Sequence, residues 1–300
     1  MPESKKLRDV GASVRARPLN LARQKGQALD LLLTRYAIER LLHRLSISPH
    51  RDRFVLKGAM LMTTWFDDPH RPTRDVDFLG YGDPAPEPML ATFRDICAID
   101  AGDGISFDVE GLRVELIREE LDYGGLRLRT TAALAGARIT IVIDVGFGDA
   151  IEPGVEEVEL PVLLDLPSPR LRAYARETVI AEKFQAMVVL GLANSRMKDF
   201  YDVWMLSRSY DFNEDRLSRA IEATFDRRGT EVPVDEPEAL SQVFANDEAK
   251  QRQWAAFVRD LGIDVPALDV VVSNLAEFLL PHARRAKGRS VGSPLKKLGP

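Results

Sequence analysis

The chain has 300 residues, of which 45% are hydrophobic and 29% charged, and its formal net charge is −5. This composition is typical of a soluble globular protein and allows one large domain or two smaller ones. The sequence contains no apolar stretch long enough to span a bilayer, no signal peptide and a single cysteine, Cys97, so we expect a cytoplasmic protein without a membrane partner. The negative charge argues against indiscriminate coating of nucleic acid but does not exclude RNA as a substrate.

Both ends of the chain are rich in lysine and arginine. Residues 1–18 predict a flexible basic arm and residues 284–300 a basic tail, for which solvated tails are the plainest interpretation. Between about Leu19 and Leu45, apolar residues recur at helical spacing and predict a helix. Arg40 and Arg44 lie on one face of that helix.

The segment from Phe54 to Leu79 predicts a short strand, a turn at Lys57-Gly58-Ala59, a helix to Phe66 and a second strand. A glycine ahead of a helix lets a phosphate approach the backbone, and a helix N-terminus carries partial positive charge. A plain turn is the alternative. We therefore expect Lys57, Gly58 and Ala59 to be nucleotide-binding residues.

The second strand of this segment begins with Asp75-Val76-Asp77. Side chains alternate along a strand, so both carboxylates point to one face, where they repel each other unless a cation lies between them. Mg²⁺ is suited to this position because it takes one or two carboxylates together with substrate phosphates. An acidic pair on a strand is often only solvated surface, but with the preceding glycine turn it predicts a site for a nucleotide and a metal.

The middle of the chain predicts a helix over Met89–Ile99 and then a sheet. Alternating or continuous apolar runs separated by glycine turns predict an antiparallel meander that extends the sheet of Asp75 and Asp77. Asp144 ends a β-branched run, where it is either a third metal ligand beside that pair or an acid that meets a turn. The expected strands cover 105–110, 112–121, 126–134 and 138–145.

A last strand is expected over Val155–Leu166, followed by a proline-punctuated linker and then by helices only. We therefore expect a catalytic domain over 19–170 and a helical domain over 171–283. The expected helices cover 175–192, 198–209, 214–227, 247–261 and 265–280.

The helical half carries a second group of candidate catalytic residues. Lys183 follows Glu182 in ETVIAEKFQA, and Asp199 and Asp202 are three residues apart on one face of a helix in SRMKDFYDVWML. Mixed charge on a helix is usually solvated surface. The functional interpretation is that Lys183 binds a triphosphate while Asp199 or Asp202 orients Lys183 or activates an acceptor hydroxyl.

Four motifs in this order give a specific resemblance. Lys57-Gly58, Arg71-x-Thr73-x-Asp75-x-Asp77, Glu-x₄-Glu-Lys and Arg-x-Lys-Asp-x-x-Asp make the chain similar to the AbiEii/AbiGii family of nucleotidyltransferase toxins, which includes the MenT proteins. The resemblance implies an α+β, polymerase-β-like mixed sheet flanked by helices, a C-terminal helical domain and an active site between the two domains. It also implies Mg²⁺-dependent transfer of a nucleoside monophosphate from an NTP to the 3′ end of tRNA, which blocks translation, and a cognate AbiEi-like antitoxin.

The same resemblance assigns roles residue by residue. It implies that Asp75 and Asp77 are metal ligands, that Lys183 contacts phosphate and that Asp199 is essential. Arg71 and Thr73 are implied to line the nucleotide pocket. Thr73 is further implied to be a phosphorylation site, since a phosphate two residues from Asp75 would repel an NTP.

Two other functions remain open on the sequence. One is a nucleotidyltransferase that modifies a protein or a small-molecule hydroxyl, which the acidic net charge favours. The other is a catalytically silent binding protein of the same fold. A basic surface for tRNA would instead use the cations near the N-terminus, which are Arg15, Arg17, Arg23, Lys25, Arg40 and Arg44.

Overall fold

The computed structural model describes residues 14, 16–24, 26–66, 73–117 and 124–292, with side chains up to residue 289. The chain divides into two compact units. The first comprises Met1–Gly148 and Glu156–Ala173, and the second comprises Asp149–Val155 and Tyr174–Pro300. The domain bounds expected from the sequence stay a prediction.

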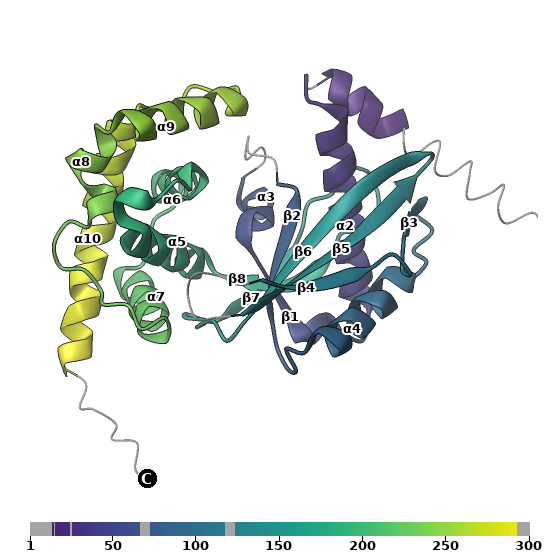
Figure 1. Ribbon diagram of the computed structural model, residues 1–300, viewed down its shortest axis with the longest axis horizontal. Helices are drawn as coiled ribbons and strands as arrows, with labels where there is room; N and C mark the ends of the chain where they lie inside the picture. The colour runs from purple at the N-terminus through teal and green to yellow at the C-terminus, as the bar shows by residue number, and fades with distance from the viewer. Residues whose placement is uncertain (1–13, 15, 25, 67–72, 118–123, 293–300) are drawn as a thin grey trace, which may run out of the picture. The chain divides into compact units, whose positions relative to one another are not determined.

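The first unit is built on a mixed sheet (Figure 1). Its strand order is β3-β5-β6-β2-β1-β8-β7, and β4 pairs with β5. The β2–β6 and β1–β8 pairs are parallel, and the pairs of β4, β3 and β6 with β5 are antiparallel, as is β1–β2. The strands are β1 (Phe54–Lys57), β2 (Asp75–Gly80), β3 (Ile105–Phe107), β4 (Arg113–Ile117), β5 (Gly125–Leu134), β6 (Ala137–Phe147), β7 (Val155–Glu159) and β8 (Arg170–Tyr174).

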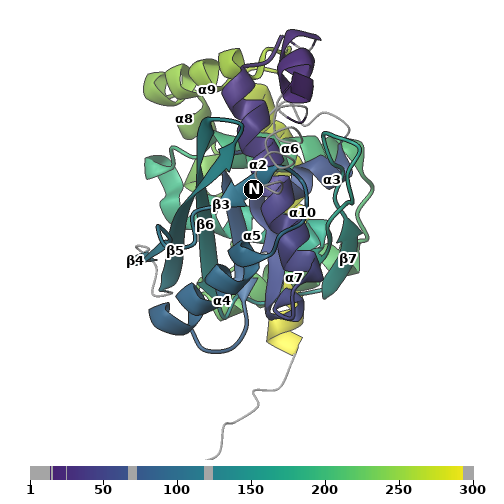
Figure 2. The same cartoon turned by 90° about the vertical axis from the view of Figure 1, so that its right-hand side faces the viewer.

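Alternating side chains give the two faces of this sheet different characters. On β6, Ile141, Ile143 and Val145 are fully buried, whereas the residues between them are partly exposed. Helices α2 (Leu29–Ile47) and α4 (Pro86–Ala98) lie against one face of the sheet (Figures 1 and 2). The predicted mixed sheet flanked by helices is therefore confirmed, including an antiparallel meander beside the strand of Asp75 and Asp77.

Some element boundaries differ from those expected. The strand expected over Val155–Leu166 ends at Glu159, and the sequence did not predict β8, where only one apolar residue alternates between arginines in RLRAY. The helix expected from Leu19 to Leu45 is interrupted at Gly26, whose φ of +64° is incompatible with a right-handed helix, and residues 16–24 are helical before it. Most of the expected N-terminal arm lies outside the described residues.

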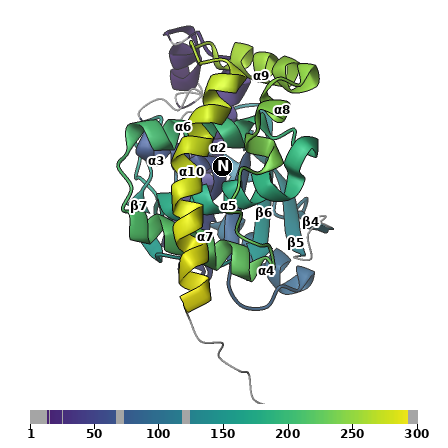
Figure 3. The same cartoon turned by 90° about the vertical axis from the view of Figure 1, so that its left-hand side faces the viewer.

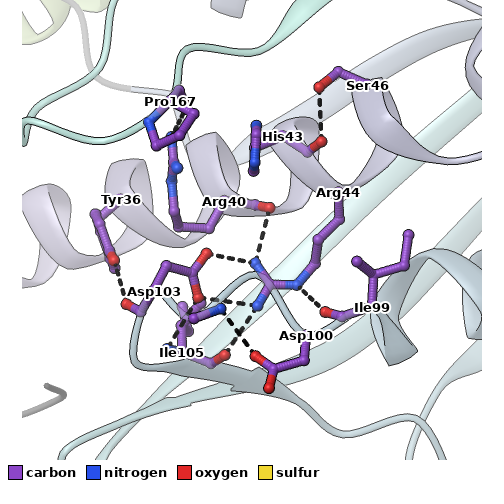
Figure 4. A network of polar contacts seen from close by, with 11 residues as sticks. Tyr36, Arg40, His43, Arg44, Ser46, Ile99, Asp100, Asp103, Ile105 and Pro167 are labelled. Atoms are coloured by element: carbon purple, nitrogen blue, oxygen red, sulfur yellow. Dashed lines mark hydrogen bonds and ion pairs between the residues drawn. The ribbon is translucent and has the colours of Figure 1, made fainter. Parts of the chain in front are cut away.

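The expectation that Arg40 and Arg44 form part of a basic surface is wrong, because both side chains are buried. Arg44 forms an ion pair with Asp103 and also donates to the carbonyl oxygens of Ile99, Arg40 and Ile105, as Figure 4 shows. Arg40 donates to the carbonyl oxygen of Pro167 at 3.0 Å. These arginines on α2 therefore connect two loops to the core through hydrogen bonds and are not available to RNA.

The second unit is helical in its described part. Helix α10 (Leu268–Gly292) runs along α6 and α7 (Figure 3), and Phe184 packs against Phe225 and Phe200 against Phe244 in the core. None of the helices in the described ranges is long and apolar enough to cross a membrane. The other α-helices are α5 (Arg176–Leu190), α6 (Met197–Ser209), α7 (Glu214–Arg227), α8 (Gln242–Ala245) and α9 (Glu248–Leu261).

Candidate active site

One face of the sheet carries charged side chains in a line across four neighbouring strands. Lys57 of β1 pairs with Asp77 of β2, Asp77 pairs with Asp144 of β6, and Asp144 pairs with Arg127 of β5. Residues directly opposite each other on paired strands share a face. Asp75 lies two residues from Asp77 and adds a third carboxylate to the same face. We call these five residues the charged row.

The strand that carries Asp75 and Asp77 is anchored by the residue between them. Val76 is fully buried, Asp77 is partly exposed and Asp75 is exposed, so the alternation that the sequence predicted is confirmed. Thr73 donates from its hydroxyl to the carbonyl oxygen of Asp75 at 3.1 Å. Arg71 lies outside the described residues, and its nucleotide contact stays a prediction.

Gly58 leaves room for the carboxylate of Asp77 close to the backbone. Its φ is +75°, and an ideal Cβ at this position would lie only 2.0 Å from Oδ2 of Asp77 and 2.8 Å from Cγ. No side chain fits there without displacing Asp77. The glycine is therefore required for the position of an acid on the neighbouring strand.

The helix expected after this turn is much shorter than the sequence suggests. Gly58–Leu61 forms the 3₁₀ segment η2, and α3 (Met62–Trp65) adds only one turn. Few peptide dipoles add up over such a length, so a helix-terminus contribution to phosphate binding is not supported. The nucleotide contacts expected of Lys57, Gly58 and Ala59 stay predictions.

Asp144 does lie beside the acidic pair, but an arginine holds it. Nε of Arg127 donates to Oδ1 at 2.7 Å and Nη2 donates to Oδ2 at 2.6 Å, a bidentate geometry. The hydrogen bond with Asp144 is the main cause that raises the pKa of Arg127. Burial opposes it, and the charges of Asp144 and Asp75 raise this pKa further. Arg127 therefore lies in the field of Asp75 as well as of Asp144.

The carboxylates of Asp75 and Asp77 fit a Mg²⁺ ion by their chemistry. They are hard oxygen donors on one strand face, and Mg²⁺ commonly takes two carboxylates and completes its shell with water and phosphate oxygens. Across the described ranges, no three histidine, cysteine or acidic side chains are arranged to hold a metal ion. The donors present therefore suit a site with two protein carboxylates, and the metal role of Asp144 stays a prediction.

The second group of candidate residues lies in the other unit and forms a compact cluster. Nζ of Lys183 on α5 is 2.5 Å from Oδ1 of Asp199 and 3.0 Å from Oδ2 of Asp202, both on α6. The side chains of Lys183, Asp199 and Asp202 are 14%, 8% and 1% exposed. The structure thus brings these predicted residues together and shows that they are not part of the solvated surface.

Burial by itself would raise the pKa of Asp199, but the nearby ammonium of Lys183 outweighs it, and the pKa is lowered overall. Lys198 and Arg196 lower it further. A general base works best when its pKa lies near the operating pH. The environment of Asp199 therefore favours the role of orienting Lys183 over that of accepting a proton.

Arg127 is the residue of the charged row that sequence reasoning did not identify. It occupies an outward position in the alternating segment GLRLRTTAAL, but alternation does not reveal which residue of β6 lies opposite. The signal that could have identified it is the tight turn at Ala135-Gly136, which sets the register of the hairpin and places Arg127 opposite Asp144.

The chain is similar to a known protein family and to solved structures. The model of the AbiEii nucleotidyl transferase toxins of type IV toxin–antitoxin systems matches residues 40–279. No curated protein matches the chain. The crystal structure of JHP933 from Helicobacter pylori is similar at 15% identity and a TM-score of 0.49, covering 88% of this chain and 97% of that one. A second H. pylori structure, provisionally described as a nucleotidyltransferase, has 15% identity and a TM-score of 0.46, covering 89% and 100%.

Proposed function

The chain belongs to the family of AbiEii nucleotidyltransferase toxins of type IV toxin–antitoxin systems, and on this premise we propose that it transfers a nucleoside monophosphate from an NTP to RNA, with the 3′ end of tRNA as the acceptor. The observation that carries the proposal is the charged row. Asp75 and Asp77 share one face of β2, and the carboxylate of Asp77 lies in the space where a side chain at Gly58 would be.

The reaction makes one bond and breaks one. The oxygen of the acceptor hydroxyl bonds to the α-phosphorus, the bond from that phosphorus to the bridging oxygen breaks, and pyrophosphate leaves with the electron pair. The hydroxyl proton passes to solvent. Asp75 and Asp77 would hold Mg²⁺, which when bound offsets the negative charge of the phosphates. The missing side chain at Gly58 leaves the space that the Asp77 carboxylate occupies.

We assign Lys183 to the phosphate chain. Its ammonium has three N–H donors, and Asp199 and Asp202 lie at hydrogen-bonding distance from it. The two carboxylates fix the direction of the ammonium, and we assign its positive charge to a phosphate oxygen. Replacing Asp199 with asparagine should therefore weaken phosphate binding without shifting the pH at which the rate is half-maximal.

Thr73 is the proposed point of control by the antitoxin. Its hydroxyl is partly exposed and is bonded to the carbonyl oxygen of Asp75. A phosphate there would add up to about two negative charges beside Asp75 and would repel the NTP. Mass spectrometry of the toxin co-expressed with its cognate antitoxin tests this. An unmodified Thr73 in toxin that is nevertheless inhibited would remove this control.

The test of the function is a labelling assay with several acceptors. Purified protein is incubated with Mg²⁺ and each α-³²P-NTP, together with deproteinised RNA, protein extract or small metabolites, beside an Asp77→Ala control. A labelled band of tRNA size that needs one NTP and is absent in the control supports the proposal. Label only in protein or metabolites would support nucleotidyl transfer but replace RNA as the acceptor. The burial of Arg40 and Arg44 favours this alternative, because it removes two cations from the expected RNA surface. No label in any sample would indicate a silent fold.

A further inference from the structure

Two features of Asp144 argue against its being a third metal ligand. Both oxygens of Asp144 accept from the guanidinium, so a metal ion would have to displace a bidentate, charge-assisted contact. In addition, Asp144 is directly opposite Asp77 on the paired strand, where two like charges destabilise the sheet unless a cation offsets them. Arg127 supplies that cation from the next strand.

Arg127 also has donors left over. A guanidinium has five N–H groups, and the pair with Asp144 uses two of them. In the described part of the chain, its side chain makes no other hydrogen bond. The side chain is 34% exposed and lies on the same face as Asp75 and Asp77. Within the described ranges it therefore has unused donors, and it places positive charge beside the acids assigned to the metal.

We propose that Arg127 binds the phosphate chain of the nucleotide and that Asp144 is a positioning residue for Arg127 rather than a third metal ligand. This inference rests on the proposed function. The planar guanidinium matches phosphate oxygens with paired N–H groups and keeps its charge at any physiological pH. With Asp144 fixing one edge of the guanidinium, little side-chain freedom is lost when the other edge meets a phosphate.

The experiment measures metal binding and phosphate binding separately. Free Mn²⁺ is titrated by electron paramagnetic resonance without nucleotide, and inorganic tripolyphosphate binding is measured by calorimetry at saturating Mg²⁺, so the preferred base need not be known. The variants are Arg127→Met, Asp144→Asn and their combination. Arg129→Met is the matched control, because Arg129 lies two residues along the same face of β5 and pairs with Glu115. Asp75→Asn reports on the metal site.

We expect Arg127→Met to weaken tripolyphosphate binding by about tenfold, the loss of one charge-assisted contact. Asp144→Asn should weaken it about threefold alone and not at all in the Arg127→Met background, since the two residues act as a unit. Mn²⁺ affinity should stay within about twofold in Asp144→Asn. Arg127→Lys should restore part of the phosphate affinity.

A loss of Mn²⁺ affinity in Asp144→Asn as large as that in Asp75→Asn would make Asp144 a metal ligand and overturn the inference. Unchanged tripolyphosphate binding in Arg127→Met, or an equal loss in Arg129→Met, would also overturn it. If Asp75→Asn leaves Mn²⁺ binding intact, it is the proposed metal site that fails. Near-ultraviolet circular dichroism confirms that each variant is folded.

Discussion

Two bidentate arginine–aspartate pairs in the first unit differ in the edge of the guanidinium that is used and in their surroundings. Arg44 binds Asp103 through Nη1 and Nη2, and Arg127 binds Asp144 through Nε and Nη2. In the pair of Arg44 and Asp103, both side chains are 2% exposed, and all five N–H donors of Arg44 are used by Asp103 and three carbonyl oxygens. In the pair of Arg127 and Asp144, the side chains are 34% and 21% exposed, and Asp144 takes two donors.

The difference indicates what each pair is for. A buried guanidinium whose donors are all satisfied stabilises the fold and has no N–H donor available for a ligand. Its removal leaves a buried carboxylate without its partner. A partly exposed guanidinium carries a smaller desolvation penalty, and among the described residues Asp144 uses two of the five donors of Arg127, as the proposed phosphate contact requires. Donor saturation thus separates the two roles better than charge or residue type does.

The largest effect is expected from Arg44→Met. This variant leaves the buried carboxylate of Asp103 without its cation and removes the hydrogen bonds to the carbonyl oxygens of Ile99 and Ile105. The free energy of unfolding should therefore fall by about 3–5 kcal/mol. Urea unfolding followed by circular dichroism measures this. Arg127→Met is the matched control and should cost less than about 1 kcal/mol. Equal losses in the two variants would remove the distinction between the pairs.

Lys183→Met should lower the free energy of unfolding by about 3 kcal/mol at neutral pH, because it removes the ammonium that lies against the buried carboxylates of Asp199 and Asp202. The folded-state pKa of Asp199 is lowered below its ordinary value of 3.8. The stabilisation that this shift represents is therefore present above pH 3.8 and is lost as the pH falls through the lower folded-state pKa.

The stability difference between wild type and Lys183→Met should be largest near neutral pH and shrink as the pH falls. Without Lys183, burial raises the pKa of Asp199, so the variant takes up a proton at a higher pH than the wild type does. This difference is measured from the unfolding midpoints of both proteins between neutral and strongly acidic pH. A difference that does not change with pH would mean that Lys183 does not stabilise the ionised form of Asp199.

Gly58→Ala should have a smaller effect on stability but a clear one on metal binding. The new Cβ is strained at a φ of +75° and overlaps Oδ2 of Asp77, so we expect a loss of about 1–2 kcal/mol and weaker Mn²⁺ binding. Gly82→Ala is the control, since Gly82 has a φ of +97° with open space around it. If the two variants lose Mn²⁺ affinity equally, Gly58 does not position Asp77.

The sequence predicted those parts of the site that depend on local periodicity. Alternation placed Asp75 and Asp77 on one strand face, and motif spacing identified Lys183, Asp199 and Asp202 before two helices were seen to bring them together. It did not predict Arg127, because this needs the register of β5 against β6, which the two-residue turn at Ala135-Gly136 sets. It misassigned Arg40 and Arg44 for a different reason, since their burial depends on loops near residues 103 and 167 that the helix itself does not specify.

The most direct test of the account is Asp77→Asn, assayed for label transfer and for unfolding on one preparation. The account predicts that transfer from α-³²P-NTP is lost, because the metal loses a ligand. The unfolding midpoint should change little, because Asp77 is partly exposed and its side chain lies outside the core. Transfer at the wild-type rate, or a loss of transfer that merely follows unfolding, would contradict the assignment of the charged row as the catalytic site.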